Sequence, residues 1–190
     1  MKTSIGAKTY VFPTPVMLVG TYDRKGRPNL MAAAWGGVCC SKPPCVCIAL
    51  RRATYTYGSL VERKAFTLGF ASREQVADVD TIGTCSGRSE DKFELLGWTP
   101  RKAEHVDAPY ADEVPLVLEC ELVHTLELGL HTLFVGEVKD ALAEDGILDA
   151  DGQIDVLALK PIAYAPIVRS YHAVGGSLGS SFTLGKQRGG

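Results

Sequence analysis

The chain has 190 residues, of which 46% are hydrophobic and 22% charged, and its formal net charge is −2 at pH 7. This length suits one domain with a sizeable core, and the composition is that of an ordinary globular protein. The slightly negative charge, with no basic patch interleaved with aromatic residues, argues against nucleic acid or an anionic membrane surface as a partner. Apolar runs are only strand-length, and the first residues lack the apolar core of a signal peptide, so we expect a cytoplasmic protein.

The first third of the chain consists of β-type runs separated by turn residues. Residues 16–22 and 29–35 lie on either side of the turn-forming segment 23–27 and predict a hairpin. Residues 46–50 are continuously apolar, which is typical of a strand buried on both faces. Residues 54–63 predict a short helix, because cations at its end suit the negative pole of the helix dipole.

Helix signals follow a further predicted strand over residues 65–70. Ser72 and Gln75 form a capping-box pattern that predicts a helix start. A second start signal lies at Ser89, and Gly97 would end that helix. Residues 98–113 are polar, contain two prolines and predict a loop.

The last third returns to strands. Residues 116–125 alternate, with Cys120 among those on one side and Glu119 on the other, and residues 131–143 predict a long returning strand. Gly136 in that strand marks a bulge or a close approach. A short helix over 154–160 and a last strand over 162–164 follow. Hairpins without regular strand–helix alternation predict a mainly β protein, an antiparallel β-barrel with a few short helices. Residues 171–190 read as a tail rich in Gly and Ser.

The stretch from Asn29 to residue 57 is the candidate ligand site. Trp35 offers a flat wall, although by composition alone a core tryptophan at a strand end is an equally good interpretation. The two glycines that follow permit close backbone approach and favour a site slightly. Asn29 could bind a polar ligand edge or serve its own backbone. Arg51, Thr54 and Thr56 follow and, with the start of the 54–63 helix, suit a phosphate.

Four other side chains are weaker candidates. Lys92, with Ser86 shortly before it, could bind an anion, although a lone lysine is more often solvated. His131 could tune a bound ring or simply end a strand with its backbone partners satisfied. Tyr164 could stack on a ligand or only pack.

Six cysteines occupy positions 39, 40, 45, 47, 85 and 120. Without an export signal a disulfide framework is not expected, and neither the cysteine nor the histidine spacing predicts a metal site. Cys45 and Cys47 flank one residue of a predicted strand and therefore face the same side. Small buried thiols on apolar strands are the favoured interpretation.

In combination, several motifs make the chain resemble the flavin reductase-like, FMN-binding split-barrel flavoproteins, and within them most closely the flavoredoxins. The motifs are Pro13-Thr14-Pro15, Arg27-Pro28-Asn29, residues 34–44, Thr54-Tyr55-Thr56-Tyr57, Ser86-Gly87, Asp91-Lys92-Phe93 and residues 127–132. The resemblance covers nearly the whole chain and implies a split-barrel domain over residues 1–170 ahead of the tail.

The resemblance also implies a homodimer with FMN held non-covalently near the dimer interface. It places Asn29, Trp35, Thr56, Lys92 and His131 at positions that contact the cofactor. Ala34, Cys40 and Ser41 fall in the segment near the flavin, where Cys40 would contribute its backbone rather than its thiol. Tyr164 keeps an aromatic wall where relatives often have phenylalanine.

These features predict a redox flavoprotein that passes electrons through FMN, with NAD(P)H or a redox protein as electron donor. No catalytic residue is assigned, and His131 is expected at most to tune the flavin. One alternative is an NAD(P)H:flavin oxidoreductase that supplies reduced FMN to a monooxygenase. The other is a flavin storage or sensing module without enzymatic activity.

Overall fold

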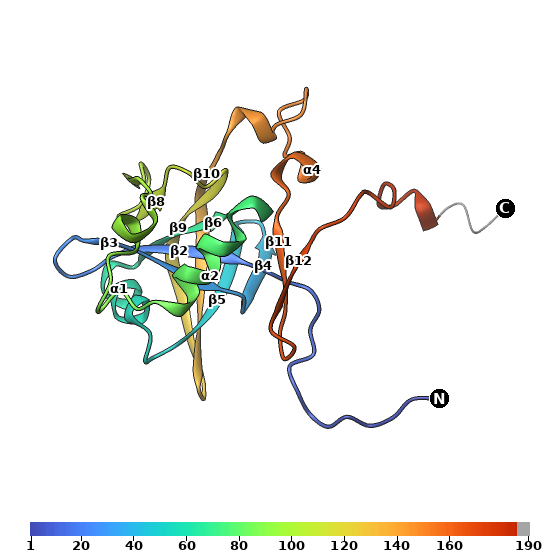
Figure 1. Cartoon of the computed structure of the whole chain (residues 1–190), viewed down its shortest axis with the longest axis horizontal. Helices are drawn as coiled ribbons and strands as arrows, with labels where there is room; N and C mark the ends of the chain where they lie inside the picture. Colours follow the sequence, from blue (N-terminus) through green and yellow to red (C-terminus); the bar gives the residue numbers. More distant parts are fainter. Residues whose placement is uncertain (186–190) are drawn as a thin grey trace.

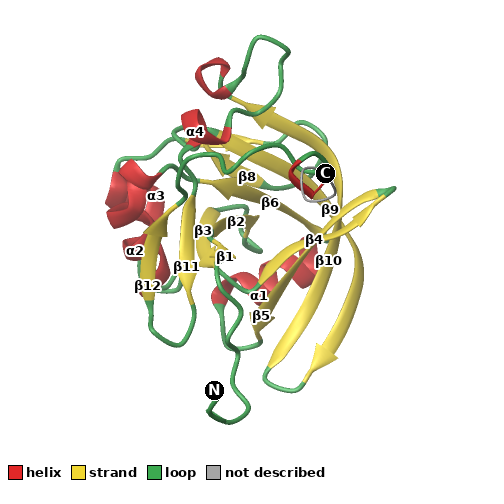
Figure 2. Ribbon diagram, turned by 90° about the vertical axis from the view of Figure 1, so that its right-hand side faces the viewer, coloured by secondary structure: helices red, strands yellow, loops and turns green. Residues whose placement is uncertain are grey.

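β-Strands dominate the computed structural model, which describes residues 1–185. A seven-stranded sheet runs in the order β3-β2-β6-β9-β10-β5-β4 and curls on itself (Figure 2), while β1-β11-β12 and β7-β8 form two smaller sheets. The strands are Thr14–Pro15 (β1), Met17–Tyr22 (β2), Pro28–Ala33 (β3), Gly36–Ser41 (β4), Pro44–Arg51 (β5), Ala65–Phe70 (β6), Pro100–Lys102 (β7), Pro109–Ala111 (β8), Leu116–Leu128 (β9), His131–Ala143 (β10), Ile162–Ala165 (β11) and Ser170–Ala173 (β12).

Short helices lie between the strands and beside the sheet. They are Tyr55–Arg63 (α1), Val76–Thr84 (α2), Lys92–Leu96 (α3) and Val156–Leu159 (α4), with 3-10 turns at Arg73–Gln75 and Asp145–Ile147. In Figure 1 the long β9–β10 hairpin projects beyond the neighbouring strands, and the N-terminal segment and the residues after β12 up to 185 lie on the side of β11 and β12, away from α1. No helix within residues 1–185 has the length and apolar character needed to cross a membrane.

Two groups of buried side chains form the core. One lies among the curled strands and includes Phe66, Leu68 and Phe134, all with no exposed surface. The other includes Val79 and Ile82 of α2 with Phe93 of α3, packed against the sheet. The apolar spacing of α2 therefore buries one face of the helix and fixes it beside β3.

Most predicted elements are present, including the capping box at Ser72 and Gln75. Gly136 fits the close-approach prediction, because a Cβ at this position would meet the ring of Phe66, and a register shift lies between Val135 and Gly136. The strand over 46–50 is also present as part of β5, but it is not buried on both faces.

Three further details of the sequence prediction are wrong. The helix expected from Ser89 begins only after Asp91, whose carboxylate accepts hydrogen bonds from the backbone N–H groups of Phe93 and Glu94. The loop predicted over 98–113 contains β7 and β8, and β4 was not predicted at all.

Regular structure continues into the first residues of the predicted tail. β12 pairs with β11 through Ala173, so the segment 170–173 completes the small sheet. Residues 174–185 are exposed, and the last part of the predicted tail, 186–190, lies outside the described residues.

Candidate functional site

A cavity of about 500 Å³, which we call the ring cavity, lies beside the ends of β3, β5 and β10. That volume is within the range of small-molecule sites. Its lining is mostly apolar and aromatic: Val16, Met31, Ala32, Ala33, Ala34, Trp35, Ala49, Arg51, Thr54, Asp80, Gly83, Thr84, Leu130, His131, Tyr164 and Tyr171.

Two strands supply one wall of the ring cavity through a simple alternation. Val46, Ile48 and Leu50 of β5 are buried in the barrel core, so Ala49 and Arg51 face the other side and line the cavity. His131 is the direct partner of Arg51 in the β5–β10 pairing. One face of the apolar run 46–50 therefore packs in the core, and the other face contributes to the cavity wall.

Trp35 and His131 present parallel rings at the ring cavity. Their planes differ by 3° and their centroids are 6.3 Å apart, and the indole is 41% exposed. The Trp35 carbonyl accepts a hydrogen bond of 2.7 Å from the N–H of Ala49, which fixes the start of β4 against β5. Glycine at position 36 allows β4 to lie this close to β5, because a Cβ there would meet the Cys47 carbonyl and the Met17 side chain. The two rings make a flat surface suited to a planar ligand.

A pair of tyrosines stands on another side of the ring cavity. Tyr164 and Tyr171 are cross-strand partners with ring centroids 5.4 Å apart. The Tyr171 hydroxyl donates a 2.9 Å hydrogen bond to the Asp80 carboxylate of α2. Burial first, and then this bond, raises the pKa of Tyr171 to about 12, so the phenol stays neutral. The pair adds aromatic surface and a fixed polar edge.

A second cavity of about 180 Å³, which we call the polar cavity, adjoins the ring cavity. Both are lined by Met31, Ala32, Thr54 and Gly83. The remaining lining of the polar cavity is Asn29, Ala53, Tyr55, Thr56, Ile82, Cys85, Ser86, Gly87, Arg88 and Lys92. A ligand with a flat part and a compact polar part could occupy both.

Lys92 is the buried cation of the polar cavity. Its side chain is held by hydrogen bonds from Nζ to the carbonyls of Leu30, at 2.9 Å, and Ile82, at 2.7 Å. The residue is 5% exposed, and burial lowers the pKa of its ammonium to about 8. An ammonium has three N–H donors, so one remains for a ligand. A buried ammonium without a carboxylate partner favours an anion as that ligand.

The start of α1 also faces the polar cavity. Thr54 is the N-cap residue, but its hydroxyl donates to the Arg51 carbonyl, at 2.9 Å, rather than capping the helix. The first backbone N–H groups of the helix therefore keep their capacity to bind an anion. Thr56 is buried, and its hydroxyl accepts a 3.1 Å hydrogen bond from the Asn29 amide.

The loop after α2 closes the polar cavity. A Cβ at Gly87 would overlap the Asn29 side chain and the Tyr55 ring, so only glycine fits. Arg88 donates a 3.0 Å hydrogen bond from its guanidinium to the Ala53 carbonyl, which ties the loop to the segment before α1. Ser86 lies in the same wall.

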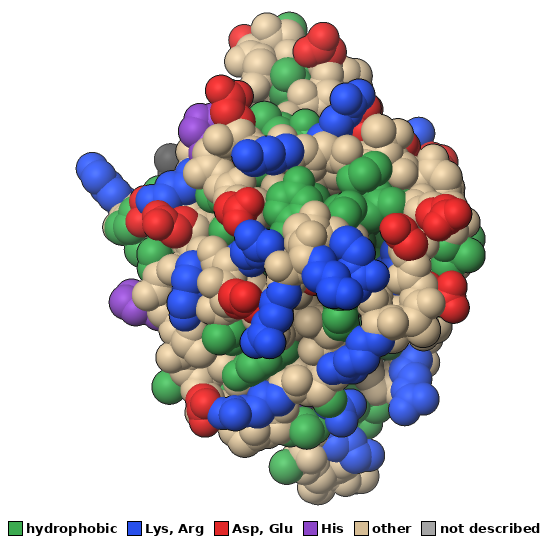
Figure 3. Space-filling view, turned by 90° about the vertical axis from the view of Figure 1, so that its left-hand side faces the viewer, with side chains coloured by type: hydrophobic (Ala, Val, Ile, Leu, Met, Phe, Trp, Pro, Cys, Tyr) green, Lys and Arg blue, Asp and Glu red, His purple; other side chains and the backbone are tan. Residues whose placement is uncertain are grey.

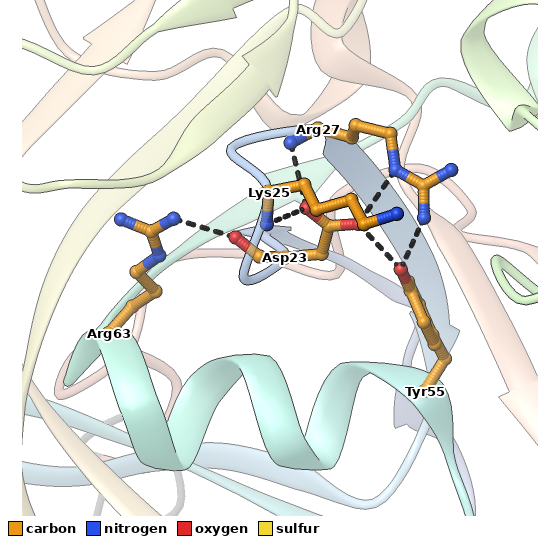
Figure 4. Close-up of polar contacts among 5 residues, drawn as sticks. All are labelled: Asp23, Lys25, Arg27, Tyr55 and Arg63. Atoms are coloured by element: carbon orange, nitrogen blue, oxygen red, sulfur yellow. Dashed lines mark hydrogen bonds and ion pairs between the residues drawn. The ribbon is translucent and has the colours of Figure 1, made fainter.

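Asp23 anchors α1 from the β2–β3 turn (Figure 4). Its carboxylate accepts hydrogen bonds from the N–H of Lys25, the N–H and guanidinium of Arg27, and the Tyr55 hydroxyl, all within 2.7–2.9 Å. The Arg63 guanidinium donates to the Asp23 carbonyl at 2.6 Å. Burial alone would raise the pKa of Asp23, but the hydrogen bonds outweigh it and hold this pKa well below its usual range. Both ends of α1 are thus tied to one turn.

The charges are distributed unevenly, although the chain as a whole is slightly negative. Lys and Arg side chains gather on the face that carries the β2–β3 turn and α1 (Figure 3). Arg27 and Arg88 line a further small cavity on this side, next to the polar cavity. A positive face raises the local concentration of anionic ligands.

Most of the predicted site residues come together around the two cavities. Ala34, Trp35, Arg51, Thr54, His131 and Tyr164 line the ring cavity, while Asn29, Thr54, Thr56, Ser86 and Lys92 line the polar cavity. Cys40 and Ser41 lie on β4, are exposed and line neither. Arg52 points elsewhere and pairs with Glu127.

Sequence reasoning did not place Asp80, Gly83, Arg88 or Tyr171 in the site. Tyr171 falls in the segment predicted as a tail, and no motif marks it. Asp80 and Gly83 lie on α2, and the apolar spacing of that helix predicts only which of its residues are buried. No sequence signal joined them to Trp35, because α2 and β12 meet at the cavity only through the fold.

Comparison with known proteins gives a consistent result. A family model described as "Flavin reductase like domain" matches residues 9–167. The flavoredoxin of Desulfovibrio vulgaris (Miyazaki F) is 50% identical, with a TM-score of 0.93 over 97% of this chain and 100% of its own. A flavoredoxin from Methanosarcina acetivorans is 31% identical, with a TM-score of 0.92 over 99% of each chain. An uncharacterised protein of Archaeoglobus fulgidus is 32% identical over 146 residues, which are 77% of this chain and 81% of that protein. These matches confirm the predicted resemblance and the mainly β split-barrel fold.

Proposed function

This chain belongs to the flavin reductase-like family, and we propose that it is a redox flavoprotein of flavoredoxin type that holds FMN non-covalently. The observation that carries the proposal is the adjoining pair of cavities, one walled by aromatic rings and the other containing the buried ammonium of Lys92. An isoalloxazine needs flat apolar contact, and a phosphate needs cations and N–H donors. The two cavities supply these separately and side by side.

The side chains and N–H groups that line the two cavities match the chemical groups of FMN. Lys92 has an N–H left for a phosphate oxygen, and the first N–H groups of α1 add further donors. Trp35 and Tyr164 offer ring faces, and Asn29, already fixed by Thr56, offers an amide oxygen. Bound FMN supplies one- and two-electron transfer, which the protein's own side chains cannot perform.

His131 is proposed to act on the flavin ring through a hydrogen bond. It lies at the start of β10, is half-buried, and lines the ring cavity beside Trp35. An imidazole N–H can donate a hydrogen bond to a nearby ring edge and so stabilise negative charge there. This makes His131 a tuning residue with no covalent role.

The test is the absorbance spectrum of the purified protein, followed by chromatography of the flavin released on denaturation. We expect a yellow protein that releases one FMN per chain and is bleached by NADH, NADPH or a reduced redox protein. Colourless protein that oxidises NADH only when FMN is added would instead establish an NAD(P)H:flavin oxidoreductase. Release of FAD would contradict the assignment of FMN. Retained FMN that accepts electrons from none of these donors would support the storage or sensing alternative.

We also propose that a second copy of the chain covers the ring cavity. Leu126, Leu128 and Leu130, at the projecting end of the β9–β10 hairpin, are 57%, 54% and 64% exposed. Leu130 also lines the ring cavity, so a partner bound to this end would reach the ligand. Clustered exposed leucines are typical of an interaction surface.

Light scattering after size-exclusion chromatography tests this dimer. Leu128→Glu should yield monomers, whereas Val156→Glu, an exposed apolar position on α4, should leave the dimer intact. A monomeric wild-type protein at micromolar concentration would contradict the proposal.

A further inference from the structure

Four of the six cysteines lie on a single hairpin formed by β4 and β5. They are Cys39 and Cys40, both exposed, Cys45, which is buried, and Cys47, which is half-buried. The prediction of small buried thiols is therefore wrong for the first two. β4 is an edge strand, so its side chains are reached by small molecules from solvent.

The strand register places Cys40 directly opposite Cys45. Directly opposed residues in an antiparallel pair have Cα atoms about 4.5 or 5.5 Å apart, and both values fall inside the range of about 4.4–6.8 Å that a disulfide requires. Burial, followed by the neighbouring Cys40 thiol, raises the pKa of Cys45, which agrees with two adjacent sulfur atoms.

The other two thiols are not directly opposed in the register, although burial and then the neighbouring Cys47 thiol raise the pKa of Cys39, so these two sulfur atoms also lie close together. Cys39 falls in the register irregularity between Val38 and Cys40 and has no direct partner, while Cys47 is opposite Gly37. A Cys39–Cys47 bond would have to span a diagonal. Among the cysteine pairs on the hairpin, Cys40 and Cys45 are the two that the strand register places directly opposite one another.

We propose that Cys40 and Cys45 form a reversible dithiol–disulfide couple that a low-molecular-weight disulfide oxidises. The exposed Cys40 thiolate attacks one sulfur of the small disulfide, forms a mixed disulfide and releases one small thiol. The Cys45 thiolate then attacks the Cys40 sulfur and releases the second small thiol. The protein loses two electrons and two protons, and the small disulfide gains both.

The couple is near the ring cavity but outside its lining. Cys45, Cys47 and Ala49 share one face of β5, and Ala49 lines the cavity. Cys45 is four residues from Ala49, which at about 3.3 Å per residue puts it about 13 Å away along the strand. Oxidation would join β4 to β5 without displacing a ligand, so the couple does not depend on the identity of the proposed cofactor.

The experiment uses the full chain as purified, fully reduced and then exposed to oxidised glutathione before an acid quench. Free thiols are counted after denaturation, and the intact mass is recorded. Wild-type protein should lose two of its six thiols and two hydrogen atoms in mass, and dithiothreitol should restore both. Six remaining thiols, a stable glutathione adduct without an internal bond, or thiols that do not return would each overturn the proposal.

Variants assign the pair, because no Lys or Arg suited to tryptic cleavage separates the four positions: Lys42 precedes Pro43. Cys39→Ser and Cys47→Ser should still lose two thiols. Cys40→Ser should lose none, and Cys45→Ser should stop at the glutathione adduct on Cys40. Loss of two thiols from Cys40→Ser would refute this pairing. Thermal unfolding of each variant, compared with wild type, shows whether the hairpin still folds.

Discussion

The buried ammonium of Lys92 predicts a specific pH dependence for FMN binding. In the free protein burial lowers the pKa of Lys92 to about 8. A phosphate near Nζ favours the charged form and therefore raises this pKa in the complex. Binding then takes up a proton when the pH is near or above 8, so affinity falls as pH rises through the pKa of the free protein.

The magnitude follows from the fraction of Lys92 that is charged. With a pKa of about 8, roughly nine-tenths is charged at pH 7 and roughly one-tenth at pH 9. If only the charged form binds the phosphate strongly, the dissociation constant rises about tenfold over this range, or about 1.4 kcal/mol. The phosphate itself is a dianion throughout, because its second pKa is near 6.

The assay is quenching of FMN fluorescence by apoprotein, titrated at pH 7, 8 and 9. Lys92→Met should weaken binding by about 1.5–3 kcal/mol at pH 7 and remove the pH dependence. Riboflavin, which lacks the phosphate, should bind wild-type protein without the tenfold change. Lys42→Met, which alters an exposed lysine in the β4–β5 turn, is the matched control and should behave as wild type.

A wild-type affinity that stays constant from pH 7 to pH 9 would refute the reasoning. So would a pH dependence that persists in Lys92→Met or is equally strong with riboflavin. Since removal of the ammonium leaves two carbonyls without their donor, thermal unfolding of Lys92→Met must be measured alongside.

Three further changes test other parts of the structure. Trp35→Ala should weaken FMN binding by about 1–2 kcal/mol, because a ring face is lost, and fluorescence titration measures it. Asp23→Asn should lower the free energy of unfolding at pH 7. The wild-type carboxylate has a depressed pKa, so its stabilisation is fully present above the unfolded value of about 4 and is lost progressively as pH falls from there through the lower folded pKa. Urea unfolding from pH 7 to 3 should therefore show the difference between the two proteins begin to narrow below about pH 4. Gly136→Ala should destabilise by about 1–3 kcal/mol by forcing a Cβ against Phe66, whereas Gly58→Ala, which meets no atom, should not.

Each of these has a contrary outcome. Equal FMN affinity in Trp35→Ala would mean that the indole is only a strand-end residue. If Asp23→Asn were less stable than wild type by the same amount at pH 3 as at pH 7, the stabilisation by Asp23 would not depend on ionisation of its carboxylate. A Gly136→Ala protein as stable as wild type would show that the strands are not in close contact there.

The local patterns predicted most elements because they depend on neighbours in the sequence. The Ser72–Gln75 capping box and the alternation of 131–143 are set by backbone geometry within a few residues. The strand β4 escaped prediction because Gly36-Gly37 and the two prolines after Ser41 read as turn chemistry. Its conformation comes from pairing with β5, a tertiary interaction that overrides a weak propensity.

Burial was harder to predict than secondary structure. Glu119 has no exposed surface, because its carboxylate accepts the backbone N–H groups of Glu104 and His105, and no pattern within β9 marks it. Lys92 presents the same difficulty, since single-sequence statistics favour solvation and only the resemblance selected it. In both cases the hydrogen-bond partners that make burial of the charged group possible lie ten or more residues away in the sequence.

The shared wall between the ring cavity and the polar cavity has an evolutionary consequence. The groups that would fasten a ligand come from the start of α1 and the 86–92 segment, whereas Tyr164, Tyr171 and His131 face its other end. Substitutions on the β11–β12 hairpin can therefore alter the surroundings of a bound ring while the groups that would hold a phosphate stay the same. A scaffold divided in this way can diversify its chemistry without having to evolve a new means of holding the anionic end of a ligand.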